Sequence, residues 1–217
     1  KGVASVVVID LRSGQEIILN PDVAFSGTSV MSLSVLMQTY MNWGNEVPPE
    51  IQTRITERVM AHPVVGAVLH ADDLAYFSGS MFNPAVLRRH LFPAYKRMGE
   101  MCRKLGLIYL FHSDGQMRDL IGDIVDCGFV GLHPIEPKPM NGVEVKKQWG
   151  NRICLLGHID VDLLARGTPQ QVRDQTRRNL DQLARDGGYC PGSANSVPDY
   201  VPLKNFIAMI EEAQAWR

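Results

Sequence analysis

The sequence predicts an α/β fold of the (β/α)8 TIM-barrel type, built from parallel strands that are covered by helices. From about residue 62, the 217-residue chain repeats one plan: a short apolar run, a polar turn and a longer stretch with helical spacing. The apolar runs are continuous rather than alternating, which is typical of parallel strands buried on both faces. No glycine-rich phosphate turn follows any strand, and the loops after the strands are polar, which favours a barrel over a doubly wound sheet.

Five βα units can be identified in residues 62–217. Their strands are predicted at 64–69, 107–111, 129–132, 152–156 and around 189–190. Their helices are predicted at 84–104, from about 115 to 126, up to about 149, from 168 onward and at about 202–216. Asn83 before Pro84 and Thr168 before Pro169 are typical helix start signals. Because a full barrel usually takes about 250 residues, the sequence allows a barrel that is incomplete on its N-terminal side.

Residues 1–60 fit this plan less well, although we expect one barrel domain over residues 1–217. Residues 5–9 and 16–19 are predicted to form a β-hairpin, and residues 48–60 a helix that begins at two prolines. A second helix, rich in Met and Leu, is predicted at 29–42. The chain begins at Lys1 rather than at Met, as a processed or partial form of a longer protein would.

The composition argues against several classes of partner. Lys plus Arg (22) nearly balances Asp plus Glu (23), and the basic residues are scattered, so neither nucleic acid nor an anionic membrane is an expected partner. No apolar run approaches the roughly 20 residues that span a bilayer, and no signal peptide is recognisable. We therefore expect a cytoplasmic protein.

The four cysteines predict neither a disulfide framework nor a zinc ribbon, because they are far apart and form no CxxC pair. Three of them lie in helix or strand patterns, where a small buried side chain is the expected role. Cys190 differs, because it lies in a glycine-rich segment at the end of a predicted strand.

Four of the six histidines lie where an apolar strand gives way to its loop: His70, His112, His133 and His158. A carboxylate follows each of them closely, in a set formed by Asp72, Asp73, Asp114, Glu136 and Asp160. In a parallel barrel these positions converge on the face where active sites lie. The sequence therefore predicts one pocket lined by imidazole and carboxylate groups from separate strands.

Each of these residues also has a structural interpretation. A single strand-end histidine is often a hydrogen-bonded wall residue, and Asp114 could simply cap a helix that begins near Gly115. The adjacent carboxylates Asp72 and Asp73 are harder to explain as caps, because burying both would be repulsive. Asn195, in a loop rich in glycine and proline, either binds a substrate carboxylate or amide, or belongs to a tight turn.

Several motifs together resemble the uroporphyrinogen decarboxylase superfamily, which also contains corrinoid-dependent methyltransferases. The motifs are His70–Leu74, Asn83–Pro84 with Phe92–Lys96, His112–Gly115, Gly157–Asp160, Gly167–Pro169 and Asn195–Pro198. Their order and spacing cover residues 62–217. The resemblance implies a (β/α)8 barrel with its active site at the carboxyl ends of the strands.

The resemblance implies different sites for the two branches. Decarboxylases of this superfamily have an N-terminal arginine-rich segment, an early Asp and a late Gly-His-Gly loop, and the last corresponds here to Ala194-Asn195-Ser196. The methyltransferases bind zinc through a His-x-Cys motif and a later Pro-Gly-Cys loop. These two motifs correspond here to His112-Ser113-Asp114 and Pro191-Gly192-Ser193, so oxygen side chains replace both thiolates. Zinc also accepts His and carboxylate ligands.

Our leading hypothesis is a corrinoid-dependent methyltransferase or demethylase with zinc as its metal. His112, Asp114 and either Cys190 or His158 would hold the ion, and Asp72 or Asp73 would orient substrate or move a proton. Substrate contacts are expected from Tyr76, His133, Glu136, His158, Asp160 and Asn195. The corrinoid would be supplied by a separate partner protein, and a homodimer is compatible with this hypothesis. The alternatives are a metal-independent decarboxylase of uroporphyrinogen or a related carboxylate, and a non-catalytic binding barrel.

Overall fold

A computed structural model describes residues 6–9, 16–19, 54 and 57–216 of the chain. The chain divides into two compact units, Lys1–Val65 and Gly66–Arg217. In the first unit, β1 (Val6–Ile9) pairs with β2 (Glu16–Leu19) in antiparallel register, which confirms the predicted hairpin. Residues 57–60 are helical, as predicted for the end of the 48–60 helix, whereas the helix predicted at 29–42 lies outside the described residues. Whether the first unit belongs to the barrel stays a prediction.

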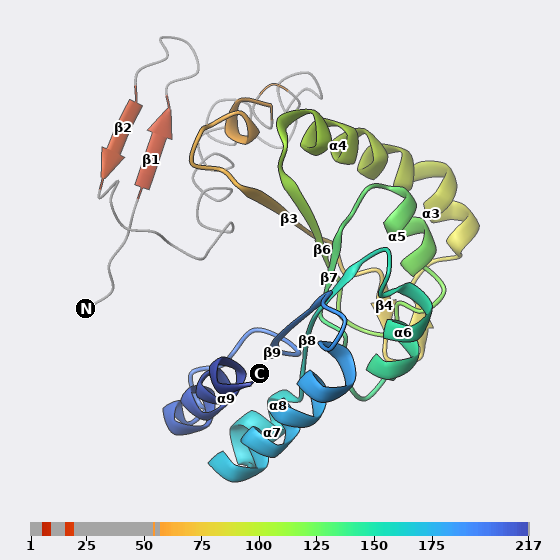
Figure 1. The fold of residues 1–217 in the computed structure, drawn as a ribbon. Helices are drawn as coiled ribbons and strands as arrows, with labels where there is room; N and C mark the ends of the chain where they lie inside the picture. The colour runs from red at the N-terminus through yellow and green to blue at the C-terminus, as the bar shows by residue number, and fades with distance from the viewer. Residues whose placement is uncertain (1–5, 10–15, 20–53, 55–56, 217) are drawn as a thin grey trace. The chain divides into compact units, whose positions relative to one another are not determined.

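The second unit is built around a parallel sheet of five strands (Figure 1). The strands are β3 (Ala67–Ala71), β6 (Ile108–His112), β7 (Gly131–His133), β8 (Cys154–Ile159) and β9 (Tyr189–Ser193). Their order in space is their order along the chain, and all four pairings are parallel. A barrel keeps this order, whereas a doubly wound sheet reverses it at a switch point. The predicted α/β class is confirmed, with five of the eight strands of a closed barrel among the described residues.

Helices follow the strands, as the sequence predicted. They are α3 (Pro84–His90), α4 (Phe92–Leu105), α5 (Ile121–Asp126), α6 (Gly142–Trp149), α7 (Val161–Arg166), α8 (Pro169–Leu183) and α9 (Leu203–Ala215). Asn83 accepts a hydrogen bond from the Ala85 amide, and Thr168 forms a capping box with Gln171. Both predicted helix starts are therefore confirmed. No helix in the described part of the chain is both long and apolar enough to cross a membrane.

Two predicted helices have different bounds in the structure. The single helix predicted at 84–104 is divided at Leu91, because Pro93 lacks the N–H that would continue the hydrogen-bond ladder. The helix predicted from about residue 115 begins only at Ile121. Gly115 has a φ of 86°, which excludes it from a right-handed helix. The amide of Gln116 instead donates to the carbonyl of Tyr76 in a hairpin formed by β4 (Ala75–Tyr76) and β5 (Gly79–Ser80).

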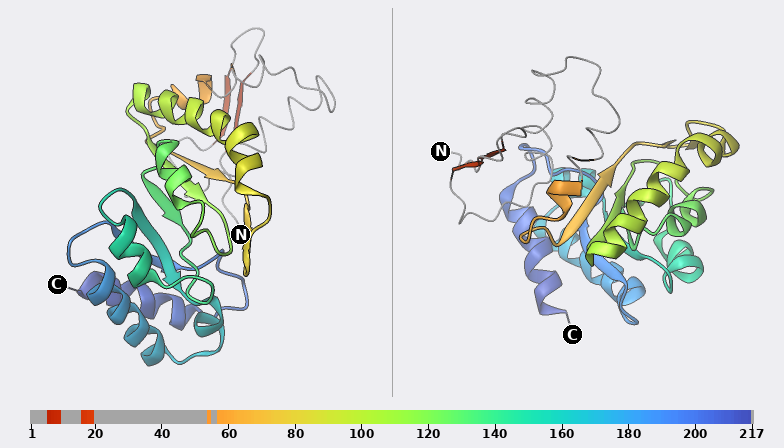
Figure 2. Two further views of the ribbon diagram at one scale, coloured as in Figure 1. Left: turned by 90° about the vertical axis from the view of Figure 1, so that its right-hand side faces the viewer. Right: turned by 90° about the horizontal axis from the view of Figure 1, so that it is seen from above.

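The two faces of the five-stranded sheet have different environments. Helices lie along one side of the sheet (Figures 1 and 2), and the side chains on this helix-covered face are buried, with Tyr109 only 1% exposed. The opposite face, here called the open face, carries Leu69 and Ile108, which are 39% and 52% exposed. Because strand residues alternate between faces, the register assigns His112 and His133 to the open face and His70, opposite Phe111, to the helix-covered face. In a closed barrel the open face is the interior.

Candidate active site

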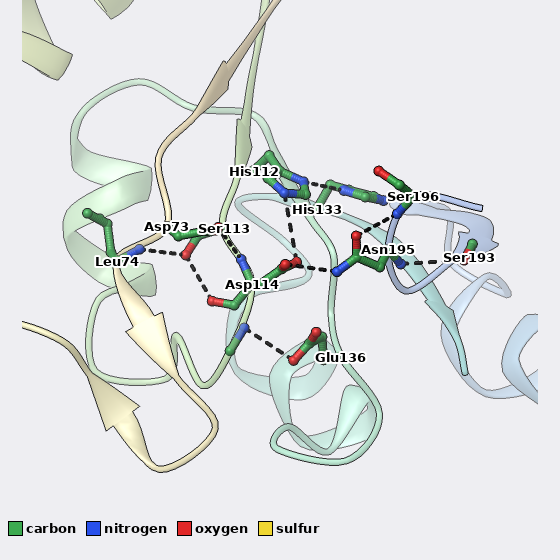
Figure 3. Close-up of polar contacts among 11 residues, drawn as sticks. Asp73, Leu74, His112, Ser113, Asp114, His133, Glu136, Ser193, Asn195 and Ser196 are labelled. Carbon is green, nitrogen blue, oxygen red and sulfur yellow. Dashed lines mark hydrogen bonds and ion pairs between the residues drawn. The ribbon is translucent and has the colours of Figure 1, made fainter. Parts of the chain in front are cut away.

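The candidate site lies at the carboxyl ends of the strands, where loops from four of them meet (Figure 3). Asp73 follows β3, His112 is the last residue of β6, and Asp114 follows it in the next loop. His133 is the last residue of β7, and Asn195 lies just beyond β9. These side chains come from segments up to about 120 residues apart, as expected for the C-terminal face of a barrel sheet.

The centre of the site is a group of three side chains, Asp73, His112 and Asp114. One ligand atom from each lies within 4.8 Å of the others. The Nε2 atom of His112 is 3.8 Å from Oδ1 of Asp114, and Oδ1 of Asp73 accepts a hydrogen bond of 3.0 Å from the Asp114 amide. An imidazole nitrogen and two carboxylate oxygens in this arrangement can bind a divalent cation.

The two carboxylate oxygens of Asp114 have different partners. Oδ2 accepts a hydrogen bond of 2.8 Å from the side-chain amide of Asn195. Oδ1 is buried and has no hydrogen-bond partner within the part of the chain that the structure describes. A buried carboxylate oxygen without a partner is costly unless a cation neutralises it. The position of Oδ1, on the side of Asp114 that faces His112, therefore fits a bound metal ion.

His112 contacts His133, the neighbouring histidine on the open face. Their Nδ1 atoms are 2.8 Å apart, and their rings are stacked with centroids 5.0 Å apart. Burial lowers the pKa of His133, and the neighbouring His112 lowers it further, whereas the Ser193 backbone acts in the opposite direction. Burial and the neighbouring His112 thus favour the neutral form of the His133 ring.

Glu136 adds a third carboxylate to this region. Its Oε2 atom accepts a hydrogen bond of 3.2 Å from the Gly115 amide. Burial raises the pKa of Glu136, and the negative charges of Asp114 and Asp73 raise it further. Burial and the neighbouring negative charges therefore favour the protonated form of the Glu136 carboxyl group.

Ser113 is a site residue to which the sequence assigned no role. It is fully buried, and its hydroxyl accepts a hydrogen bond of 3.0 Å from the Leu74 amide. This bond ties the loop after β3 to the loop after β6 and so keeps Asp73 close to Asp114. The position of Ser113 between His112 and Asp114 was the only signal for this role in the sequence.

Asp72 belongs to a different group of side chains from Asp73. Its Oδ2 atom accepts hydrogen bonds from the Tyr95 hydroxyl (2.5 Å) and from Nε2 of His70 (3.0 Å), and the Tyr109 hydroxyl lies 3.3 Å from Nδ1 of His70. We call His70, Asp72, Tyr95 and Tyr109 the helix-side cluster. The prediction that His70 would join the other strand-end histidines is therefore wrong, because its position in β3 faces the helices.

His158 and Asp160 are engaged with the protein itself. Nδ1 of His158 donates a hydrogen bond of 2.8 Å to the Ile135 carbonyl, burial lowers the pKa of the ring, and its φ is 75°. The ring packs against Gly142, where a Cβ atom would come within 2.6 Å of Nε2. Asp160 caps α7 by accepting a hydrogen bond of 2.9 Å from the Asp162 amide. Neither residue joins the three-residue centre.

Tyr76 and Cys190 also lie apart from this centre. Tyr76 is 62% exposed on the β4–β5 hairpin. Cys190 is exposed in β9, where it is paired with Leu156 of β8. Burial raises the pKa of the Cys154 thiol, and the nearby Cys190 raises it further. The structure therefore does not bring Cys190 into the candidate metal site, because it lies three residues before the end of its strand.

A parallel α/β sheet with imidazole and carboxylate groups at the carboxyl ends of its strands defines an enzyme-like barrel of the TIM class. The family model described as Uroporphyrinogen decarboxylase (URO-D) matches residues 56–216. The chain belongs to this family. Membership is compatible with a methyltransferase-like or a decarboxylase-like role.

Three individual proteins to which the chain is similar are methyltransferases. The chain is 23% identical over 208 residues to the methylcobamide:CoM methyltransferase MtaA of Methanosarcina barkeri. An MtaA sequence from Methanosarcina barkeri (strain Fusaro / DSM 804) is 21% identical over 210 residues. Both matches cover 88% of this chain and 58% of the relative, so the chain spans less than two thirds of their length. A solved methyltransferase from Methanosarcina mazei is similar in fold, with a TM-score of 0.61 and 20% identity over 85% of this chain and 54% of that one.

Proposed function

We propose that this chain provides the metal site of a methyltransferase that moves a methyl group from a methylated corrinoid to a thiol. The observation that carries the proposal is Oδ1 of Asp114, which is buried, lies beside Nε2 of His112 and has no hydrogen-bond partner among the residues that the structure describes. The two MtaA relatives support the reaction class, because their names specify a methylcobamide and CoM.

The proposed metal ligands are Asp73, His112 and Asp114. Three protein ligands with an open fourth position are typical of catalytic zinc sites, and zinc accepts both imidazole and carboxylate ligands. No protein cation already neutralises the site, because no Lys or Arg forms an ion pair with these carboxylates within the described residues. When bound, the ion supplies Lewis acidity that favours the thiolate form of the acceptor.

The remaining residues have supporting roles in this proposal. Asn195 holds Oδ2 of Asp114 and thereby turns Oδ1 toward His112. Glu136, whose pKa is raised by burial and by the nearby carboxylates, takes up the thiol proton. The corrinoid would be bound by a partner protein at the strand ends, and a homodimer stays a prediction.

The proposal is tested by a methyl-transfer assay on the chain loaded with zinc. Methylcob(III)alamin and a small thiol are mixed with the protein, and loss of the methylcorrinoid is followed by visible spectroscopy. We expect turnover that is abolished by a chelator and restored by zinc. Equal turnover with and without the chelator would contradict the metal-assisted reaction.

A metal-independent decarboxylase is the second candidate, because the matching family model is named after uroporphyrinogen decarboxylase. It would release carbon dioxide from a bound porphyrinogen or smaller carboxylate without a metal. The negative charges of Asp73, Asp114 and Glu136 disfavour it, since they repel an anionic substrate unless a cation lies between them. A third candidate, a binding barrel without catalysis, predicts that His112→Ala leaves every ligand-dependent property unchanged.

A further inference from the structure

We infer that His133 is a positioning residue that fixes the tautomer of His112, so that the Nε2 lone pair of His112 is directed into the proposed metal site. This inference rests on the metal site proposed above. It concerns two imidazole rings in direct contact, rather than the carboxylates of the site.

The contact is built into the sheet. His112 ends β6, His133 ends β7, and the two residues are paired in the parallel register. Their side chains therefore emerge side by side on the open face, and their Nδ1 atoms are 2.8 Å apart. At this distance one Nδ1 atom must donate an N–H hydrogen bond and the other must accept that bond, because two facing lone pairs would repel.

The proposed metal site decides which ring donates. If His133 donated, neutral His112 would carry its proton on Nε2, which lies 3.8 Å from Oδ1 of Asp114. That arrangement would place a proton where the cation is proposed to bind. If His112 donates from Nδ1, its Nε2 lone pair is free, and His133 keeps its own proton on Nε2.

In the second arrangement each ring of the pair carries a single proton and keeps one nitrogen as an acceptor. A neutral ring that carries its proton on Nε2 has Nδ1 available as an acceptor. In this arrangement Nδ1 of His112 donates to Nδ1 of His133, and Nε2 of His112 keeps its lone pair for the metal ion.

A neutral acceptor suits this site for electrostatic reasons. Metal-bound histidines usually donate their second N–H to a carboxylate or a carbonyl oxygen. Three carboxylates already surround this centre, namely Asp73, Asp114 and Glu136. An imidazole acceptor orients His112 without adding a fourth negative charge.

The test compares two variants that differ in a single property. In His133→Asn the side-chain oxygen can occupy the position of Nδ1 and accept the bond, whereas His133→Leu has similar bulk and no acceptor. Loss of such an outer contact typically weakens metal binding about 10- to 100-fold. In calorimetric titrations with zinc we expect this loss for His133→Leu and a loss below about 3-fold for His133→Asn. Equal affinities of the wild-type protein and both variants would overturn the inference.

The tautomer itself is measured on the metal-free protein, so that the inference is tested even if the wild-type chain binds no zinc. Long-range ¹H–¹⁵N NMR spectra distinguish a protonated from an unprotonated ring nitrogen. We expect wild-type His112 to carry its proton on Nδ1, and the population to shift toward Nε2 in His133→Leu. Protonation of wild-type His112 on Nε2 would overturn the inference. Failure of zinc binding with the expected tautomer would instead contradict only the proposed function.

Discussion

Two groups of histidine and aspartate side chains lie near the carboxyl edge of the sheet, one with its histidine on the helix-covered face and the other with its histidine on the open face. In the helix-side cluster, Asp72 accepts hydrogen bonds from Tyr95 and His70, and the His70 ring packs against the rings of Tyr95 and Phe111. In the group formed by Asp73, His112 and Asp114, here called the open-face group, Oδ1 of Asp114 is buried and has no hydrogen-bond partner within the described ranges of the chain. The same residue types thus form a satisfied structural network on one face and an unsatisfied one on the other. The comparison teaches that the same residue types can be satisfied by hydrogen bonds within the protein on one face, while on the other face a buried carboxylate oxygen is left available for a ligand.

The largest expected effect is on metal binding by the open-face group. His112→Ala removes a proposed ligand, and we expect zinc affinity to fall by more than about 100-fold, beyond the range for outer contacts. The matched control is His90→Ala, at an exposed position near the end of α3, which should leave the affinity unchanged. Calorimetry measures both. Similar zinc affinities for the two variants would contradict the role of His112 as a metal ligand.

A smaller effect on metal binding is expected for the residue that orients Asp114. Asn195→Ala deletes the donor to Oδ2, so the carboxylate can rotate and share its charge with water. We expect zinc to bind about 10-fold more weakly, as is typical for loss of an outer contact. Asn151→Ala, at an exposed turn before β8, is the control. An unchanged affinity in Asn195→Ala would show that Asp114 needs no such support.

For the helix-side cluster we expect a change in stability instead. Tyr95→Phe removes the hydroxyl that donates to Asp72, which should lower the free energy of unfolding by about 1 kcal/mol and the melting temperature by about 2–4 °C. Zinc affinity should stay within about 2-fold of wild type, because this cluster lies on the opposite face. Tyr200→Phe, at a side chain that is 68% exposed, serves as the control for thermal melting. A Tyr95→Phe variant of normal stability but weakened zinc binding would reverse the assignment of the two faces.

The smallest expected effect concerns the pH dependence of stability in the metal-free protein. The folded-state pKa of Glu136 is raised, so its contribution to stability is fully present below its ordinary pKa and is lost as the pH rises through the raised value. Glu136→Gln removes this loss, and we expect the variant to be more stable than wild type at pH 8 by less than about 1 kcal/mol. Near pH 4 the difference should disappear. Denaturant unfolding at both pH values measures the difference in the free energy of unfolding. Glu100→Gln, at an exposed position of α4, is the control. A difference that does not depend on pH would contradict the raised pKa of Glu136.

Much of the fold could be predicted because its signals are local. The apolar runs gave the five strands, and Asn83 and Thr168 gave the helix starts. The division at Leu91 and the late start of α5 were missed. In the latter case the positive φ of Gly115 and the hydrogen bond from Gln116 to the β4–β5 hairpin are tertiary features.

The sequence predicted where the site residues lie along the strands, but not which face of the sheet each side chain occupies. Strand ends indicated where His112, His133 and Asp73 would lie, because parallel strands end at one edge of the sheet. Which face a side chain occupies depends on the exact phase of the strand, and a shift of one residue reverses it. For this reason the sequence could not separate Asp72 from Asp73. Nor did it predict that the ring of His158 binds the Ile135 carbonyl.

The central claim is that the open-face group holds one divalent metal ion. It is tested most directly by the metal content of the 217-residue chain, expressed with zinc in the medium and purified without a chelator. Mass spectrometry of the elements should find about one zinc per chain in the wild-type protein and almost none in a folded Asp114→Ala variant. A folded wild-type protein without metal, or equal metal in both proteins, would contradict the claim.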